Sequence, residues 1–288
     1  MKVLVTSSTG LTGKAITKAL SHAGATVVAM VHSESHSQEM KEIGASEVVI
    51  ADVTNVDDLR KVMSNVDAVY YICPTAYPEE GKIGQLAINV AKEVHVKKFI
   101  YQSVLHSIEP SLIHHRQKLM VEQALIDSGL NYVILQPAPF MQNILNARDA
   151  LFKSHIFVQK FFHDKNSKNL INLIDVNDYA EAAAHTILNN EFSSSTFEIC
   201  GPKNLSAADI LNDMKKVLSS EIELKFITDE EFTKMSQSHH VSNDKISTLL
   251  IMFKHYNEGD FCGNDFFAKQ IIGHQLTTFE KFLQKESK

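Results

Sequence analysis

The segment from Thr6 to Gly13 has the residue types and the spacing of a loop that binds phosphate groups. Its residues are Thr6, Ser7, Ser8, Thr9, Gly10, Leu11, Thr12 and Gly13. Two glycines three residues apart, after an apolar run and before a helical pattern, match the last two positions of a GxxGxxG loop. Gly10 would let the backbone approach a pyrophosphate, and Gly13 would let the helix pack tightly on the strand. The free N–H groups of the helix N-terminus would then face the phosphates.

Ser7 stands where the first glycine of that loop is expected. If the position needs a positive φ, serine there costs about 1–2 kcal/mol; its hydroxyl could instead bind a phosphate. A plain turn is the alternative for the whole segment, but its place in a strand–helix–strand unit favours a dinucleotide. A nucleoside-triphosphate P-loop is excluded, because Ser8 replaces its leading glycine and Ala15 replaces the metal-binding Ser or Thr.

The end of the second apolar run bears on which dinucleotide is bound. A preference for NAD usually places an acid there, but the residue is His32, and Glu34 lies two residues beyond it. The missing carboxylate permits a 2′-phosphate. We therefore expect NADP(H), with NAD(H) as the alternative. His32 would bind the phosphate, unless it is a solvated loop histidine.

Two further pairs follow the third and fourth apolar runs. Asp52 and Val53 are placed to meet the adenine edge, with a helix cap or loop carboxylate as the alternative role for Asp52. Cys73 and Pro74 would lie under the ribose or the pyrophosphate; alternatively, the proline simply ends a strand.

Six short apolar runs alternate with helical patterns through the first half of the chain. The runs are Val3–Val5, Val27–Val31, Val48–Ile50, Val69–Ile72, Phe99–Tyr101 and Tyr132–Leu135. They are unbroken rather than alternating, as in parallel strands buried on both faces. Repeated strand–helix–strand units with right-handed crossovers predict an α/β protein with a doubly wound parallel sheet. A helix is expected at Val176–Leu188 and a strand at Thr196–Cys200.

The regular alternation of apolar runs with helical patterns ends at Pro137, which indicates a second part of the protein. Residues 1–137 plus about 171–200 are expected to form the dinucleotide-binding core. Residues 138–170 plus 201–288, the latter with helices joined by polar loops, would form a smaller substrate lobe over the carboxyl ends of the strands. Its aromatic residues are Phe140, Phe152, Phe157, Phe161 and Phe162. They would line a cleft for a flat apolar substrate or form the core of the lobe.

Composition excludes several classes of function. Of the 288 residues, 44% are hydrophobic and 22% charged, which is typical of a globular protein. A net charge of −6 provides no broad basic field, so nucleic acid is not an expected partner. No apolar stretch approaches the ~20 residues that span a bilayer, and no secretory signal is recognisable. The three cysteines and the histidine pairs lack the spacing of metal ligands, so we expect no metal and a cytoplasmic location.

With these residues the chain resembles the NmrA-like family of atypical short-chain dehydrogenases/reductases over nearly its full length. The matching segments are Val5–Gly13, 98–103, 118–122, 128–130, 135–137, 140–143, 174–178, 201–202, 256–261, Gly273 and 277–279. The resemblance implies a Rossmann core, NAD(P) binding and a small C-terminal substrate lobe. The family includes quinone and dye reductases, and also NADP(H)-sensing regulators without clear catalysis.

The resemblance also implies positions for catalytic groups. Lys118 fits the lysine of the superfamily's YxxxK helix and would bind the nicotinamide ribose. His114 stands where the tyrosine is expected, on the same helical face. A histidine with an ordinary pKa near 6.5 could protonate a reduced oxygen; alternatively, His114 belongs to an exposed start of the helix. Ser103, Pro137 and Phe140, in the matching segments, would complete the cofactor site.

Three functions are compatible with these residues. The first is hydride transfer from NAD(P)H to a small flat acceptor such as a quinone, which needs little acid assistance. The second is a non-catalytic redox sensor that binds NADP(H) and signals through a protein partner; the altered glycine loop and the missing tyrosine favour it. The third, a nucleoside-diphosphate-sugar epimerase activity, is disfavoured because that chemistry needs the tyrosine base.

Overall fold

The computed structural model describes residues 1–74, 76–160 and 167–288. Its centre is a seven-stranded sheet in which every neighbouring pair is parallel. The strands are β1 (Lys2–Val5), β2 (Thr26–Val31), β3 (Glu47–Ile50), β4 (Ala68–Tyr71), β5 (Lys98–Gln102), β6 (Tyr132–Pro137) and β9 (Ser195–Ile199). Their order is β3-β2-β1-β4-β5-β6-β9. The predicted doubly wound sheet is confirmed, because each unbroken apolar run forms a strand.

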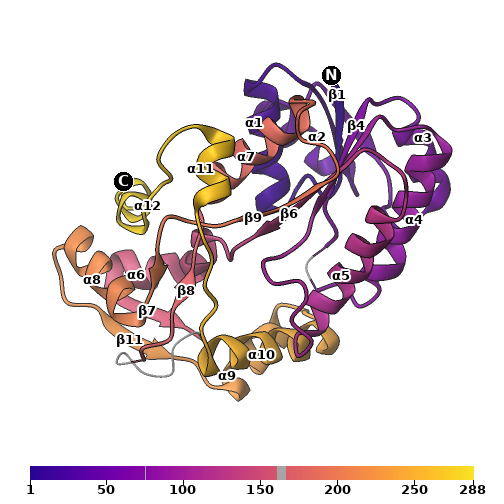
Figure 1. Ribbon diagram of the computed structural model, residues 1–288. Coiled ribbons are helices and arrows are strands. Elements are labelled where there is room, and N and C mark those ends of the chain that lie inside the picture. The colour runs from indigo at the N-terminus through magenta and orange to yellow at the C-terminus, as the bar shows by residue number, and fades with distance from the viewer. Residues whose placement is uncertain (75, 161–166) are drawn as a thin grey trace.

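Helices cover both faces of the sheet, as Figure 1 shows. One face packs against α1 (Leu11–His22), α7 (Val176–Leu188) and α11 (Phe266–Ile272), with α2 (Ser37–Ile43) beside α1. The other face packs against α3 (Val56–Met63), α4 (Glu80–Glu93) and α5 (Ile113–Ile126). Successive strand residues point to opposite faces: Val3 and Val5 enter one core, and Leu4 enters the other.

The remaining elements form the smaller part of the molecule, at the lower left and bottom of Figure 1. They are η2 (Met141–Ala147), α6 (Arg148–Ser154), β7 (Ile156–Gln159), β8 (Ile171–Asn172), β10 (Asn204–Leu205), α8 (Ala207–Leu218), β11 (Glu223–Phe226), α9 (Asp229–Ser238), α10 (Asn243–Glu258) and α12 (Phe279–Glu286). One further 3-10 turn, η1 (Glu34–His36), follows β2. β11 pairs with β7, and β10 pairs with β8.

The sequence pattern predicted only helices after residue 201, but the structure also has the strands β10 and β11 there. β10 has only two residues and carries no recognisable period. β11 does alternate charged with apolar residues, but over four residues only, and this strand pattern was overlooked. α11 also lies in the range assigned to the lobe, yet it packs against α7 and β9 of the large sheet. The proposed boundaries of the two parts stay a prediction.

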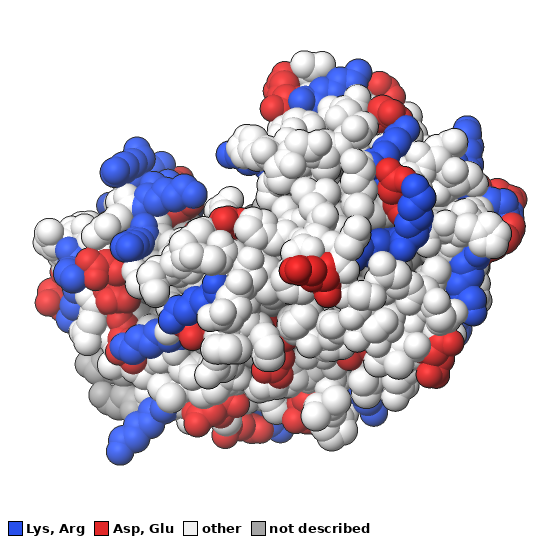
Figure 2. All heavy atoms as spheres, turned by 45° about the horizontal axis from the view of Figure 1, so that its top comes forward, with Lys and Arg blue, Asp and Glu red and all other residues white. Residues whose placement is uncertain are grey.

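Charged side chains of both signs lie around the edge of the face shown in Figure 2, and its centre is largely uncharged. This mixture agrees with the net charge of −6 and gives that face no single-sign field. Among the described residues, no helix is both long and apolar enough to cross a membrane.

Candidate functional site

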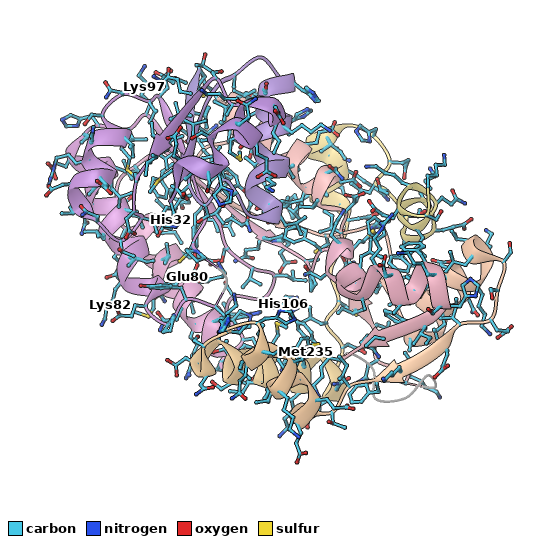
Figure 3. All side chains as sticks on the ribbon, turned by 180° about the vertical axis from the view of Figure 1, so that it is seen from behind. His32, Glu80, Lys82, Lys97, His106 and Met235 are labelled. Carbon is cyan, nitrogen blue, oxygen red and sulfur yellow. The ribbon has the colours of Figure 1, made fainter. Side chains whose placement is uncertain are left out.

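A cavity of about 490 Å³ lies at the carboxyl ends of β1, β2, β4, β5 and β6. Fourteen of the predicted site residues line it: Ser7, Thr9, Gly10, Leu11, Thr12, Gly13, His32, Cys73, Pro74, Ser103, His114, Lys118, Pro137 and Phe140. Parallel strands end at one edge of a sheet, which is why residues so far apart in the sequence meet here. In Figure 3 His32 and Glu80 lie toward this edge, whereas Lys97, which precedes β5, lies at the opposite end.

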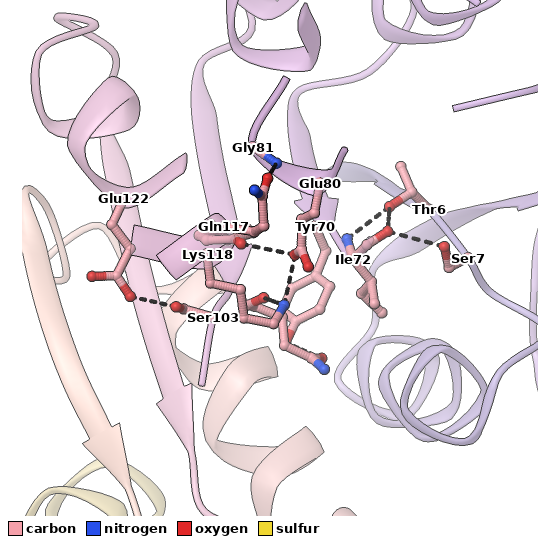
Figure 4. A network of polar contacts seen from close by, with 12 residues as sticks. Thr6, Ser7, Tyr70, Ile72, Glu80, Gly81, Ser103, Gln117, Lys118 and Glu122 are labelled. Carbon is pink, nitrogen blue, oxygen red and sulfur yellow. Dashed lines mark hydrogen bonds and ion pairs between the residues drawn. The ribbon is translucent and has the colours of Figure 1, made fainter. Parts of the chain in front are cut away.

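The loop after β1 has a strained backbone at the position of the missing first glycine. Ser7 has φ of +46°, in the left-handed region that glycine adopts without cost. Its hydroxyl donates to the carbonyl oxygen of Ile72 at 2.9 Å, and the Thr6 hydroxyl donates to the same oxygen at 2.9 Å. Figure 4 shows these bonds, which tie the loop to the end of β4. The Ser7 hydroxyl is thus bonded to protein in this structure, although Ser7 lines the cavity.

The two glycines of the loop serve different purposes. A Cβ on Gly13 would lie 2.4 Å from the Ser7 carbonyl oxygen and 2.6 Å from the Ser8 Cα, so α1 can pack this closely on the loop only with glycine there. A Cβ on Gly10 would meet nothing closer than the Ser7 oxygen at 3.5 Å. Gly10 has an ordinary φ of −75° and lines the cavity. Packing therefore does not require glycine at this position, and its missing side chain leaves open space at the cavity wall.

Four predicted cofactor residues, Thr6, Ser8, Asp52 and Val53, are not among those that line the cavity in the described part of the chain. Thr6 and Ser8 are fully buried; the Ser8 hydroxyl donates to the Met30 carbonyl oxygen at 2.7 Å. Thr6 and Ser8 thus hold the loop on the side that faces the protein interior, away from the cavity. Hydrogen bonds from the Thr54 N–H and hydroxyl, with the charge of His32, lower the pKa of Asp52. Contact of Asp52 and Val53 with an adenine ring stays a prediction.

Lys118 lines the cavity from α5 and pairs with a buried acid that no sequence motif indicated. Its Nζ lies 2.7 Å from Oε1 of Glu80, whose side chain is 1% exposed. The same oxygen accepts a hydrogen bond of 3.0 Å from the Tyr101 hydroxyl, and Lys118 Nζ also lies 3.4 Å from the Gln102 carbonyl oxygen. Figure 4 shows Lys118 and Glu80 pointing toward each other. In the sequence, Glu80 looks like a surface residue because it follows Glu79 at the start of a helix.

Ser103 is held by a second buried acid. Its hydroxyl donates to Glu122 Oε1, and the Ser107 hydroxyl donates to Glu122 Oε2 at 3.0 Å. The side-chain amide of Gln136 donates to both carboxylate oxygens, at 2.9 and 3.1 Å. The Ser103 hydroxyl therefore has a protein acceptor, and its predicted contact with the cofactor is not tested by this geometry.

The half-buried His114 lies on the cavity wall beside His115, which is fully buried. Burial, together with the charges of His115 and Lys118, lowers the pKa of His114 to about 3. The imidazole is therefore neutral at pH 7, and the ordinary pKa assumed from the sequence does not apply. Among the described residues the buried Nδ1 of His114 has no hydrogen-bond partner. Burial also lowers the pKa of His115 to about 4, although its Nδ1 lies 2.8 Å from the His106 carbonyl oxygen.

The remaining wall of the cavity is mostly apolar. Met252 and Tyr256 contribute from α10, and Phe140, whose ring centroid lies 5.4 Å from that of Tyr179, contributes from the segment after β6. Of the other aromatic residues expected at a cleft, Phe152 and Phe157 pack in the core instead. Phe161 and Phe162 lie outside the described residues. Phe140 thus lines the cavity while Phe152 and Phe157 belong to the core, and binding of a flat substrate there stays a prediction.

Asp175 caps α7 by accepting a hydrogen bond of 2.8 Å from the Asn177 N–H. Within the described ranges no group of three or more His, Cys, Asp or Glu side chains is arranged to hold a metal ion.

Comparison with known proteins gives a consistent picture. Residues 1–283 match the model of the NmrA-like family. The chain is 24% identical over 288 residues to prestalk A differentiation protein A of Dictyostelium discoideum, covering 99% of this chain and 92% of that protein. It superposes on the NADPH complex of an NADPH-dependent quinone oxidoreductase from Escherichia coli with a TM-score of 0.82, at 20% identity and coverage of 98% and 99%. The NADP(H) complex of Citrobacter sp. triphenylmethane reductase gives 0.82, at 16% identity and coverage of 99% for both chains.

Proposed function

This chain belongs to the NmrA-like family, and we propose that it is an oxidoreductase that transfers hydride from NADP(H) to a small flat acceptor such as a quinone. The observation that carries the proposal is one continuous cavity. Its wall includes the glycine loop after β1 as well as Lys118 and His114 of α5. The two structurally similar reductases, whose complexes contain NADPH and NADP(H), support the choice of cofactor.

The loop has the features that a pyrophosphate requires. Gly10 leaves open space at the cavity wall, and α1 begins at Leu11 with N–H groups that have no partner within the helix. The missing acid after β2 and the position of His32 at the cavity favour the phosphorylated cofactor. His32 would bind the 2′-phosphate, and NAD(H) would bind more weakly.

A bound reduced nicotinamide would supply the hydride. The side chains of the protein would bind the cofactor and the acceptor and orient them toward each other. Lys118 would donate to the ribose hydroxyls from α5. The neutral imidazole of His114 would donate a hydrogen bond to an oxygen of the acceptor as negative charge develops there; at pH 7 it would not act as an imidazolium acid. Phe140, Met252 and Tyr256 would hold a flat apolar ring and exclude water.

The experiment is a panel of acceptors. Purified protein is incubated with NADPH and benzoquinones, naphthoquinones or triphenylmethane dyes, and the loss of reduced nicotinamide is followed. We expect turnover with at least one class, and a joint loss of turnover and NADPH affinity in Lys118→Ala. Tight NADPH binding with no acceptor reduced would contradict the enzymatic proposal.

The second candidate is a non-catalytic NADP(H) sensor that acts through a protein partner. The observation that favours it is the state of the expected catalytic groups: histidine replaces the tyrosine, and the Ser103 hydroxyl is bonded to Glu122. A sensor must bind NADP⁺ and NADPH differently, since equal binding cannot switch anything. Equal affinities and equal conformations with both would exclude this candidate.

A further inference from the structure

We propose that Glu80 is a positioning residue for the nicotinamide half of the cofactor, acting through Lys118; this rests on the function proposed above. Glu80 is the first residue of α4, and its carboxylate pairs with Lys118 in the interior between α4 and α5 (Figure 4). The two side chains are 1% and 14% exposed.

Stability alone is a poor reason for such a pair. Taking two charges out of water costs about as much as their attraction returns, and a buried ion pair can often be replaced by apolar residues without loss of stability. The cost is reduced here because Glu80 lies at the N-terminus of a fourteen-residue helix, where the helix dipole favours negative charge. A pair that contributes little net stability, yet lies beside a cavity, indicates a role in the cavity.

The geometry of the ammonium group defines that role. An ammonium has three N–H donors, and Lys118 has two acceptors in the described structure, Glu80 at 2.7 Å and the Gln102 carbonyl oxygen at 3.4 Å. These two contacts fix the side chain and leave one donor for a ligand. Lys118 Nζ also lies 5.5 Å from the centroid of the Tyr101 ring, and the hydroxyl of that ring donates to the same Glu80 oxygen.

The contact between α4 and α5 is held at an adjacent point as well. The side-chain oxygen of Gln117, next to Lys118, accepts a hydrogen bond of 2.9 Å from the Gly81 N–H, next to Glu80. Two successive residues of α5 thus bind two successive residues of α4. Glu80 can lose its charge while this second contact keeps the two helices in register.

The test separates the two halves of the cofactor by calorimetric titration with NADPH and with 2′,5′-ADP, which lacks the nicotinamide ribose. We expect Glu80→Gln to weaken NADPH binding roughly tenfold, the value of one charge-assisted hydrogen bond, and to leave 2′,5′-ADP binding unchanged. The matched control is Glu79→Gln. Glu79 is 57% exposed and pairs only with Lys82 in the described structure, so this variant should bind both ligands normally.

A double mutant shows whether Glu80 acts through Lys118. If it does, Glu80→Gln should have no further effect on NADPH binding in a Lys118→Met background. A tenfold loss in that background, equal losses for both ligands, or no loss at all in Glu80→Gln would overturn the inference. If Glu80→Gln does not fold, Tyr101→Phe removes the second donor to Glu80; we expect about a threefold loss confined to NADPH, and no loss would overturn the inference. Wild-type protein that binds neither ligand would instead overturn the proposed function itself.

Discussion

The two ends of the cavity differ in which groups of the protein form their surface. At the end formed by β1 and α1, much of the surface is backbone, and the hydroxyls of Thr6, Ser7 and Ser8 donate to carbonyl oxygens of the protein. At the end formed by β5 and α5, two buried carboxylates, Glu80 and Glu122, bind Lys118 and Ser103.

The two ends of the cavity should differ in which substitutions they tolerate. A surface made of N–H groups depends on close packing more than on any one side chain, so the glycines should be the most sensitive residues there. A surface made of paired side chains depends on each partner, because loss of one leaves the other buried and unpaired. The predictions below test this contrast, from the largest expected effect to the smallest.

At the backbone end, Gly13→Ala should destabilise the protein by about 3 kcal/mol, because the new Cβ would clash with backbone atoms of Ser7 and Ser8. Gly10→Ala is the matched control: its Cβ has ordinary contacts, so stability should not change, while NADPH binding should fall. Urea unfolding and calorimetry measure the two effects. Equal stability of the two variants would contradict the packing argument.

At the side-chain end, stability should depend on pH through His115. Unfolded histidine titrates near pH 6.5, but burial lowers the pKa of His115 to about 4. Below pH 6.5 the unfolded chain therefore takes up a proton that the folded protein excludes, and stability is lost as pH falls from 6.5 toward 4. This histidine should cost about 2 kcal/mol between pH 7 and pH 5.

His115→Leu should remove that part of the pH dependence, as measured by urea unfolding at both pH values. The exposed His22 provides the control, since His22→Gln should keep the wild-type dependence. A variant without His115 that loses as much stability at pH 5 as the wild type would show that burial of this ring is not the cause.

The role of His114 as a neutral donor predicts a moderate effect on turnover. His114→Phe should lower turnover about tenfold, with little change in NADPH affinity, because one hydrogen bond to the acceptor is lost. Since the pKa of His114 is about 3, this residue should contribute no titration to the activity between pH 5 and 8. His255→Phe, a histidine that does not line the cavity, is the control. An activity step near pH 6.5 that disappears only in His114→Phe would restore the imidazolium acid.

The smallest effect is expected at His32. It is exposed, so its interaction with a 2′-phosphate is weakened by solvent. His32→Gln should reduce the preference for NADPH over NADH roughly threefold, measured as the ratio of the two dissociation constants. An unchanged ratio would make His32 a bystander.

The contrast between the two ends also explains what the sequence could predict. Strands such as β2 and β4 are unbroken apolar runs, and the Gly10–Gly13 spacing is local, so the fold and the loop were predictable. The place of Ser7 in the loop raised a positive φ as one of two options, and the structure has it. Glu80 was not predictable, because its burial depends on α5 packing over the start of α4, which no local pattern encodes.

The pKa of His114 was misjudged for a similar reason. An isolated histidine has an ordinary pKa, and only burial in the folded protein, next to His115 and Lys118, lowers it. Short strands such as β8 and β10 were missed because two residues carry no period. Sequence patterns therefore predicted the backbone end of the cavity well and the side-chain end only in part.

Thermal unfolding with and without cofactor tests the central claim, dinucleotide binding in this cavity, most directly. A ligand that binds only the folded protein stabilises it by about 2.7 kcal/mol at a hundredfold excess over its Kd. We predict that millimolar NADPH raises the Tm of the wild type, that NADH raises it less, and that Gly10→Ala removes both shifts. A Tm unchanged by either cofactor, or shifts that persist in Gly10→Ala, would contradict the account.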